Sequence, residues 1–130
     1  MSYNLEIEKR GHFLFVTAQG IRTHETLISI AEEVVGACIK HSVREAVVDI
    51  SNLEGRLSIG DSYLIATKSF PKLHRLGTLD RVVLVDCEEN GERIKFFGRI
   101  AQGLGMNVQV FMDINEALKI IPHEAIINVH

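Results

Sequence analysis

The sequence contains little of several residue types that mark special classes of protein. Among its 130 residues there is no tryptophan, and proline and cysteine occur twice each. So few cysteines exclude a scaffold stapled by disulfides, and so few prolines exclude a collagen-like chain. Cys38 and Cys87 lie far apart in the chain, so we expect reduced thiols. No apolar run approaches the ~18 residues of a membrane-spanning helix, which predicts no integral membrane association.

Neither sign of charge dominates the chain. Lys and Arg number 14 and Asp and Glu number 17, which gives a formal net charge of −3. Nucleic-acid binding usually requires a basic face and a high isoelectric point, so we expect no nucleic-acid partner. The first residues lack a basic stretch followed by an apolar run, the pattern of an export signal. We therefore expect a cytoplasmic protein.

The composition is that of an ordinary globular protein, with 46% apolar and 24% charged residues. Because domains commonly contain ~150 residues, we expect a single domain over residues 1–130. Alternating apolar residues at 5–9 and a mainly apolar run at 12–19 flank Arg10-Gly11 and predict a β-hairpin.

Helices and strands are then expected to alternate along the chain. Thr23, Ser58, Asn90 and Asp113 are candidate N-caps, and Pro71 and Gly105 are candidate helix ends. The expected elements are a helix at 23–40, a strand at 45–50, a helix at 58–71, a strand at 81–86, a helix at 90–105, a strand at 107–112 and a helix at 113–122. Residues 125–129 could form a further short strand or an irregular end.

This order, ββαβαβαβα, predicts an α/β fold. Strands that alternate with helices pair in parallel through right-handed crossovers. We therefore expect a five-stranded, mostly parallel sheet with an antiparallel N-terminal edge strand and four helices. The edge strand or an apolar helix face could also pair two copies into a homodimer, and the sequence leaves this open.

Polar residues gather where the expected parallel strands end, the edge of the sheet at which such folds bind ligands. Gly20 and Arg22 lie there, and Asp49 and Asp86 follow neighbouring strands, so we expect these two carboxylates to lie close together. A carboxylate pair could hold Mg²⁺ or transfer protons. Alternatively, each Asp binds backbone N–H groups at its own turn, the commoner role of Asp there.

No pattern in the sequence indicates catalysis or a metal centre. The six histidines show no metal-ligand spacing with one another or with cysteine, and no serine or cysteine has an arguable histidine partner. We therefore expect no enzyme, no metal and no cofactor. A hydrolase or transferase would require Asp49, Asp86 and His24 within hydrogen-bond reach of one another.

Two short segments resemble a known family. Val47-Val48-Asp49-Ile50-Ser51, followed by Ser58-Ile59-Gly60, resembles the third strand and the next helix start of STAS domains, the SpoIIAA-like anti-sigma-factor antagonists. The expected order of elements also fits over almost the whole chain. The strand at 81–86, the helix at 94–100 and the ending at 111–118 resemble a subgroup called STAS/SEC14-like, small stand-alone bacterial domains.

The resemblance implies a non-enzymatic regulatory module that binds a protein partner. In regulatory members a kinase phosphorylates the second serine of a D-S-S-G loop, and that position is Ile59 here, within Leu57-Ser58-Ile59-Gly60. Ser58 and Ser62 are nearby hydroxyls, although Ser58 also suits an N-cap. The candidate partner- or anion-binding rim is Asp49, Ser51, Ser58, Asp61, Ser62 and Asp86.

The Sec14 branch of the resemblance implies a different function, the binding of a small apolar ligand or lipid. Sec14-type domains are longer and enclose their ligand beneath a helix, so a full lipid cavity is not expected here. Phe70, Leu73, Leu76, Phe96 and Phe97 could form a small apolar cleft or belong to ordinary core.

Overall fold

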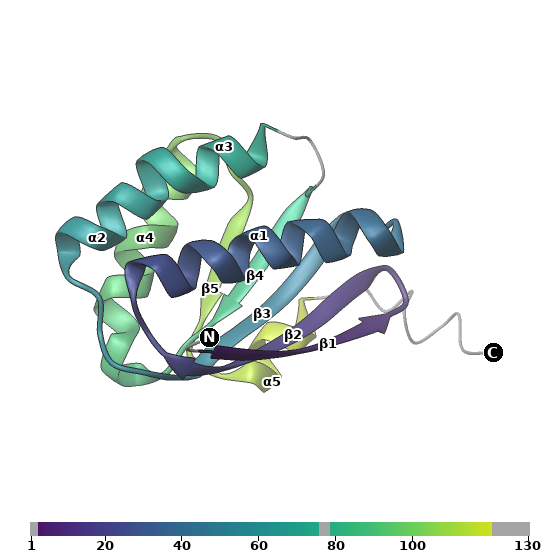
Figure 1. The fold of residues 1–130 in the computed structure, drawn as a ribbon, viewed down its shortest axis with the longest axis horizontal. Coiled ribbons are helices and arrows are strands. Elements are labelled where there is room, and N and C mark those ends of the chain that lie inside the picture. The colour runs from purple at the N-terminus through teal and green to yellow at the C-terminus, as the bar shows by residue number, and fades with distance from the viewer. Residues whose placement is uncertain (1–2, 76–78, 121–130) are drawn as a thin grey trace.

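The computed structural model describes residues 3–75 and 79–120, which contain a five-stranded sheet with the strand order β1-β2-β3-β4-β5. β1 (Tyr3–Arg10) and β2 (Phe13–Ile21) form the expected antiparallel hairpin. β3 (Glu45–Glu54), β4 (Arg81–Val85) and β5 (Val108–Phe111) continue the sheet in parallel (Figure 1). The expected α/β fold is therefore confirmed.

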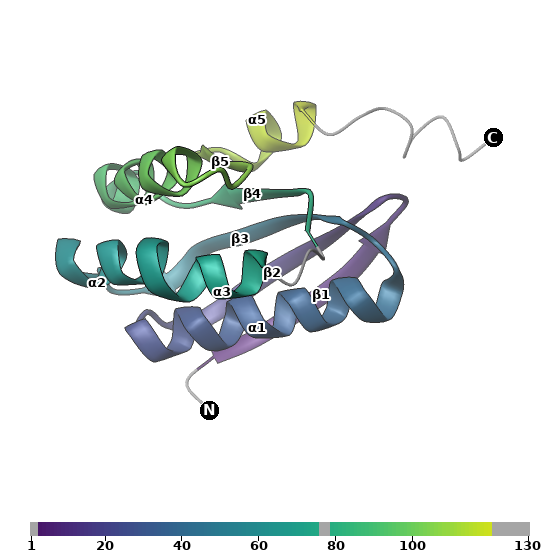
Figure 2. The same ribbon diagram turned by 90° about the horizontal axis from the view of Figure 1, so that it is seen from above.

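The helices cover the two faces of the sheet unequally. α1 (His24–His41), the helical segment that begins with α2 (Ile59–Leu64), and α4 (Gly91–Gly103) lie on one face. The short helix α5 (Ile114–Lys119) lies on the opposite face, as Figure 2 shows. β2, β3, β4 and β5 therefore contribute alternate side chains to two separate cores. On β3, for example, Val48 packs in the larger core and Val47 in the smaller one.

Side-chain caps begin three of the helices where the sequence predicts them. The Thr23 hydroxyl accepts a hydrogen bond from the backbone N–H of Thr26 at the start of α1. At α2 the Ser58 hydroxyl accepts a hydrogen bond from the backbone N–H of Asp61. At α5 the Asp113 carboxylate accepts one from the backbone N–H of Asn115. Each cap satisfies a backbone donor that would otherwise lack an intrahelical partner.

The helical segment through Pro71 differs from expectation, because it does not end at the proline. α2 leads directly into a π-helical turn, Ile65–Ser69, and then into α3, Phe70–His74. Proline has no N–H and clashes with the preceding turn of a regular helix. In the wider turn the N–H of Phe70 bonds the carbonyl of Ile65, so Pro71 stands at the beginning of a new α-helical turn.

Both cysteines are free thiols, as expected. Cys38 is fully buried in the larger core, and this burial raises the pKa of its thiol to about 11. The thiol is therefore neutral near pH 7 and packs as a small apolar side chain. Among the helices of the described residues, none is long and apolar enough to span a membrane. The expected features at Leu76, Pro122 and residues 125–129 lie outside the described residues.

Candidate functional site

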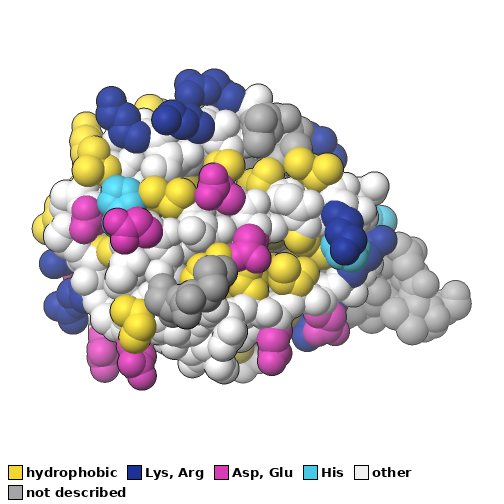
Figure 3. Space-filling model, viewed as in Figure 1, with side chains coloured by type: hydrophobic (Ala, Val, Ile, Leu, Met, Phe, Trp, Pro, Cys, Tyr) yellow, Lys and Arg dark blue, Asp and Glu magenta, His cyan; other side chains and the backbone are white. Residues whose placement is uncertain are grey.

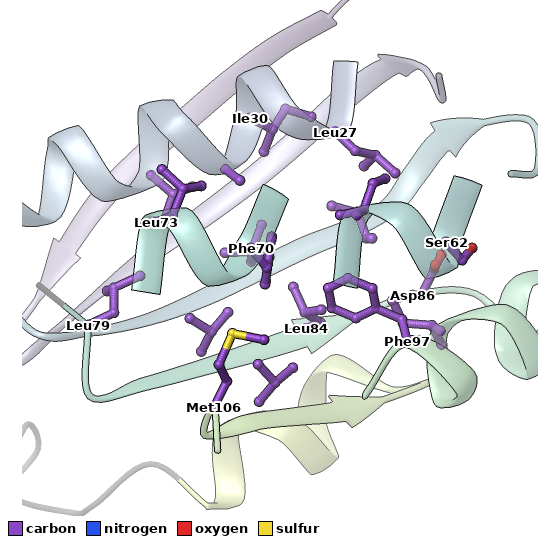
Figure 4. A pocket seen from close by; sticks show the side chains of 18 of the residues that line it. Leu27, Ile30, Ser62, Phe70, Leu73, Leu79, Leu84, Asp86, Phe97 and Met106 are labelled. Atoms are coloured by element: carbon purple, nitrogen blue, oxygen red, sulfur yellow. The ribbon is translucent and has the colours of Figure 1, made fainter. Parts of the chain in front are cut away.

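A cavity of about 120 Å³ lies between the sheet and the three helical segments on its larger-core face. α1 supplies Leu27 and Ile30, the sheet supplies Val48 and Leu84, and α4 supplies Phe97. Figure 4 shows aliphatic and aromatic side chains along most of its length, with Ser62 and Asp86 together at one end. The cavity is therefore lined mainly by apolar side chains, with Ser62 and Asp86 at one end and His74, Asp80, Arg81 and Asn107 near the starts of β4 and β5.

Of the five residues of the expected apolar cleft, three line the cavity, one does not, and one lies outside the described residues. Phe70, Leu73 and Phe97 line the cavity. Phe70 meets Phe97 edge to face, with the ring centroids 4.9 Å apart. Phe96 is half-buried and does not line the cavity, and Leu76 lies outside the described residues. The aromatic pair thus joins α3 to α4 over the chamber.

A buried ion pair lies at the Ser62 end of the cavity. The guanidinium of Arg22 donates to both carboxylate oxygens of Asp86, from Nη1 to Oδ2 at 2.9 Å and from Nη2 to Oδ1 at 2.8 Å. Arg22 is 7% exposed and Asp86 is 1% exposed. Nη2 of Arg22 also donates to the carbonyl of Ile50 at 3.0 Å, and the N–H of Cys87 donates to Asp86 Oδ1 at 2.8 Å. These additional bonds compensate for the desolvation of both charges.

The alternation of side chains along the strands brings Arg22 and Asp86 to the same face of the sheet. Arg22 follows β2 directly, and Asp86 follows β4. The backbone N–H of Arg22 bonds the carbonyl of Glu54, and that of Asp86 bonds the carbonyl of Phe111. Both side chains then lie on the larger-core face, at the carboxyl ends of the parallel strands. Arg22 was expected at this edge of the sheet, but its burial and its ion pair with Asp86 were not predicted. No local sequence pattern marks an arginine for burial.

Asn90, which the sequence predicts as an N-cap at the rim, also lines this end of the cavity. Its side-chain amide donates to the carbonyl of Gly55 at 3.4 Å and to Sγ of Cys87 at 3.3 Å. The side chain therefore makes no capping bond to α4, contrary to expectation. Asn90 is 5% exposed, and its Oδ1 has no hydrogen-bond partner among the described residues. The same is true of Nε of Arg22.

The expected pairing of Asp49 with Asp86 is wrong. Asp49 is in register with Val85, which belongs to the smaller core, so Asp86 at the next position points to the opposite face. Asp49 instead binds Ser51, whose N–H and hydroxyl donate to its Oδ1 at 3.0 and 2.6 Å. The two carboxylates therefore form no shared cation or proton-transfer site. Each accepts a backbone N–H at its own turn, from Ser51 and from Cys87 respectively, which is the alternative role expected for them.

The remaining rim residues lie around the start of α2. Ser58 is exposed, whereas Ser62 is buried at the cavity end. Asp61 lies 3.3 Å from Nδ1 of His24, measured from its Oδ1. His24, Asp49 and Asp86 thus have three different partners and do not converge. Within residues 3–75 and 79–120, no group of three or more His, Cys, Asp or Glu could hold a metal ion.

Large apolar side chains are exposed on α2 itself. Ile59 is 54%, Tyr63 51% and Leu64 43% exposed. Figure 3 shows hydrophobic side chains over this end of the molecule, beside a histidine and acidic groups. We call Ser58, Ile59, Asp61, Tyr63 and Leu64 the α2 surface. Ile59 and Tyr63 are four residues apart on the helix, so their side chains lie on the same side of it.

Comparison with solved structures shows the fold. An anti-sigma factor antagonist from Mycobacterium paratuberculosis is 18% identical, with 91% of this chain and 92% of that chain covered and a TM-score of 0.57. An uncharacterized protein with a SpoIIAA-like fold from Shewanella loihica PV-4 is also 18% identical, with the same coverage and a TM-score of 0.48. No protein-family model and no curated protein sequence matches the chain. The chain therefore has the fold of an anti-sigma factor antagonist, which confirms the fold expected from the STAS resemblance.

Proposed function

We propose that the protein is a non-enzymatic regulatory module that binds a protein partner through the α2 surface. The observation that carries this proposal is the exposure of Ile59, Tyr63 and Leu64 on one short helix. Tyrosine is enriched among the residues that dominate binding energy at interfaces. The fold of the M. paratuberculosis protein, which is described as an anti-sigma factor antagonist, supports a role in regulation.

The polar groups beside these side chains suit the rim of such an interface. Ser58, Asp61 and His24 adjoin the apolar cluster and remain at least partly accessible. Of the two hydroxyls near the start of the helix, Ser58 is the exposed one, so it is the position at which modification would alter contact with a partner. Asp86 and Ser62 lie inside the protein, so we assign them no part in this interface.

Affinity capture with the tagged protein tests the proposal. We expect Tyr63→Lys to weaken capture of a specific partner from its native extract by at least about tenfold, because a charge would replace an aromatic anchor. The matched control is Ile39→Lys, since Ile39 is 56% exposed on α1. Quantitative mass spectrometry compares the three samples. If Tyr63→Lys retains every partner that the unaltered protein captures, the α2 surface is not the interface.

A second function is favoured by a separate observation, the apolar cavity. We propose that this chamber binds a small apolar ligand. Its volume of about 120 Å³ is close to that of an engineered protein cavity of ~150 Å³ that binds benzene. Such a ligand would fill space between α1, α3 and α4 without touching the α2 surface, so the two functions are compatible.

A further inference from the structure

We propose that the partner of the α2 surface carries an acidic segment, which binds a basic surface beside it on the helical segment through α3 and on α4. This inference rests on the first proposed function, the binding of a protein partner through the α2 surface, and it adds the chemistry of that partner. The basic surface consists of five exposed side chains, which we call the basic ridge: Lys68, Lys72, Arg75, Lys95 and Arg99.

Charge is distributed unevenly along the chain. Residues 62–79 and residues 93–112 each contain three basic residues and no Asp or Glu. The rest of the chain therefore holds eight basic residues and all 17 acidic ones. The two segments carry a net charge of +6 in a chain whose formal net charge is −3. Five of these six cations belong to the ridge, so the ridge is the basic part of an acidic protein.

The cations of the ridge have no counter-charge within the described part of the chain. None of the five forms an ion pair with an Asp or Glu of residues 3–75 and 79–120. Arg22, Arg44 and Arg81, in contrast, each bind a carboxylate of the same chain. The ridge can therefore bind carboxylates of a partner without first breaking an ion pair inside the protein.

The packing of two helical segments brings the ridge together. The segment that contains α2 and α3 lies beside α4 on the larger-core face of the sheet (Figures 1 and 2), and the contact of Phe70 with Phe97 joins the two. Lys68 and Lys72 are four residues apart, and the two ridge residues of α4 have the same spacing, which places side chains on one side of a helix. Figure 3 shows Lys and Arg side chains gathered along the upper edge of the molecule, above α3.

The basic ridge continues the α2 surface along the same helical segment. Leu64, the last residue of α2, is exposed and lies four residues before Lys68, which is exposed as well. Protein interfaces commonly have an apolar centre and a polar rim, and the charges of the two rims are complementary. On the α3 side of the α2 surface the rim is basic. The facing rim of the partner is therefore acidic.

A protein segment suits these two surfaces better than a nucleic acid or a lipid bilayer. Nucleic acids and anionic bilayers are extended polyanions, so they would also meet the acidic remainder of the chain, with its eight basic and 17 acidic residues. A short segment places its carboxylates only against the ridge. Its apolar side chains can also cover Tyr63 and Leu64, which a phosphate backbone would leave in water.

The first test uses a defined acidic probe. Hexa-L-glutamate is titrated into the isotope-labelled protein at low ionic strength, with hexa-L-glutamine as the uncharged control. We expect the glutamate peptide to shift the backbone amide NMR signals of the ridge, and the glutamine peptide to shift none. The shifts should disappear at about 0.5 M NaCl, because salt screens exposed charges. No shifts, or shifts gathered away from the ridge, would overturn the proposal.

The second test uses the protein that the unaltered chain captures from its native extract and Tyr63→Lys does not. Lys68→Gln with Lys72→Gln removes two cations from the ridge, whereas Lys9→Gln with Lys40→Gln removes two exposed cations elsewhere. We expect the first double variant to slow association with this partner about threefold to tenfold at low salt, because charges at the rim of an interface chiefly steer association. The second should change the rate less than about twofold. Surface plasmon resonance at several NaCl concentrations measures both rates.

The outcomes separate this inference from the function on which it rests. If Tyr63→Lys abolishes capture but both double variants associate at the same rate, the α2 surface binds a partner without an acidic segment, and only this inference is wrong. If the ridge variant reduces sedimentation with phosphatidylglycerol vesicles and leaves the partner unaffected, the ridge contacts a lipid surface, which also overturns it. If Tyr63→Lys retains every partner, the α2 interface and this inference both fail.

Discussion

Arg22 and Asp86 carry opposite full charges in a part of the protein from which water is almost excluded. Their two parallel hydrogen bonds, together with the backbone bonds to Ile50 and Cys87, compensate both charges. Each residue therefore depends on the other. The pair also anchors the connection after β2 to the connection after β4, which lie on either side of β3.

We predict that Asp86→Asn lowers the free energy of unfolding by about 3–5 kcal/mol, because it leaves the Arg22 guanidinium buried without its counter-charge. Urea denaturation near pH 7 measures the effect. The double variant Arg22→Met with Asp86→Leu should recover most of the loss, since it removes both charges together. A loss below about 1 kcal/mol in the single variant would contradict the assignment of a tightly coupled pair.

At the scale of elements, α4 approaches β5 closely at Gly98. A Cβ atom at this position would lie 2.8 Å from Cγ2 of Val110, a distance that real Cβ atoms essentially never show. Valine is branched at Cβ and cannot easily turn the methyl group away. The absence of a side chain at Gly98 therefore determines how closely the helix packs on the sheet.

We predict that Gly98→Ala destabilises the protein by about 1–3 kcal/mol, the usual cost of overpacking. The matched control is Gly36→Ala on α1, where a Cβ atom meets nothing within 4 Å. That substitution should stabilise the protein by about 0.5–1 kcal/mol, because alanine loses less backbone entropy in a helix. Thermal unfolding followed by circular dichroism compares the two. Equal effects of the two substitutions would show that α4 is not packed this closely on β5.

The helical segment through Pro71 shows how far an element can be predicted from local sequence. The cap at Ser58 lies in a short motif, and the structure has the helix start there. The effect of Pro71 depends on whether the preceding turn can widen, and Ile65 and Ala66 of that turn are buried in the larger core. From the proline alone a helix end is predicted at Pro71, whereas the chain continues there through a π-helical turn into α3.

For the whole molecule, the sequence predicts the architecture because each strand and helix carries its own periodic pattern. β4 contains the uninterrupted apolar run Val82-Val83-Leu84-Val85, and the hairpin is marked by Gly11 at its turn. The alternation of these elements, together with the handedness of crossovers, then leaves few possible topologies. The observed strand order β1-β2-β3-β4-β5, in which each strand lies beside its neighbour in the sequence, agrees with these rules.

The candidate site was less predictable, because it depends on the relative orientation of side chains from distant segments. Asp49 and Asp86 both follow apolar runs, yet the register between β3 and β4 sends them to opposite faces. The partner of Asp86 is Arg22, which is separated from it by 64 positions in the chain. The cavity arises from the spacing of three helical segments, and no short motif encodes an empty volume.

The same empty volume has a mechanical consequence. Pressure favours whichever state occupies less volume, and internal voids vanish when a protein unfolds. The chamber of about 120 Å³ is partly open to solvent, so the part that water leaves empty adds to an unfolding volume change that we expect on the order of tens of mL/mol. Ala31→Leu, in the lining on α1, should reduce that change and raise the pressure at half-unfolding, whereas Ala37→Leu, on the same helix but off the lining, should not, as fluorescence of Tyr3 and Tyr63 under pressure would measure. Hydrostatic compression thus measures in solution how much space the three helical segments leave unfilled.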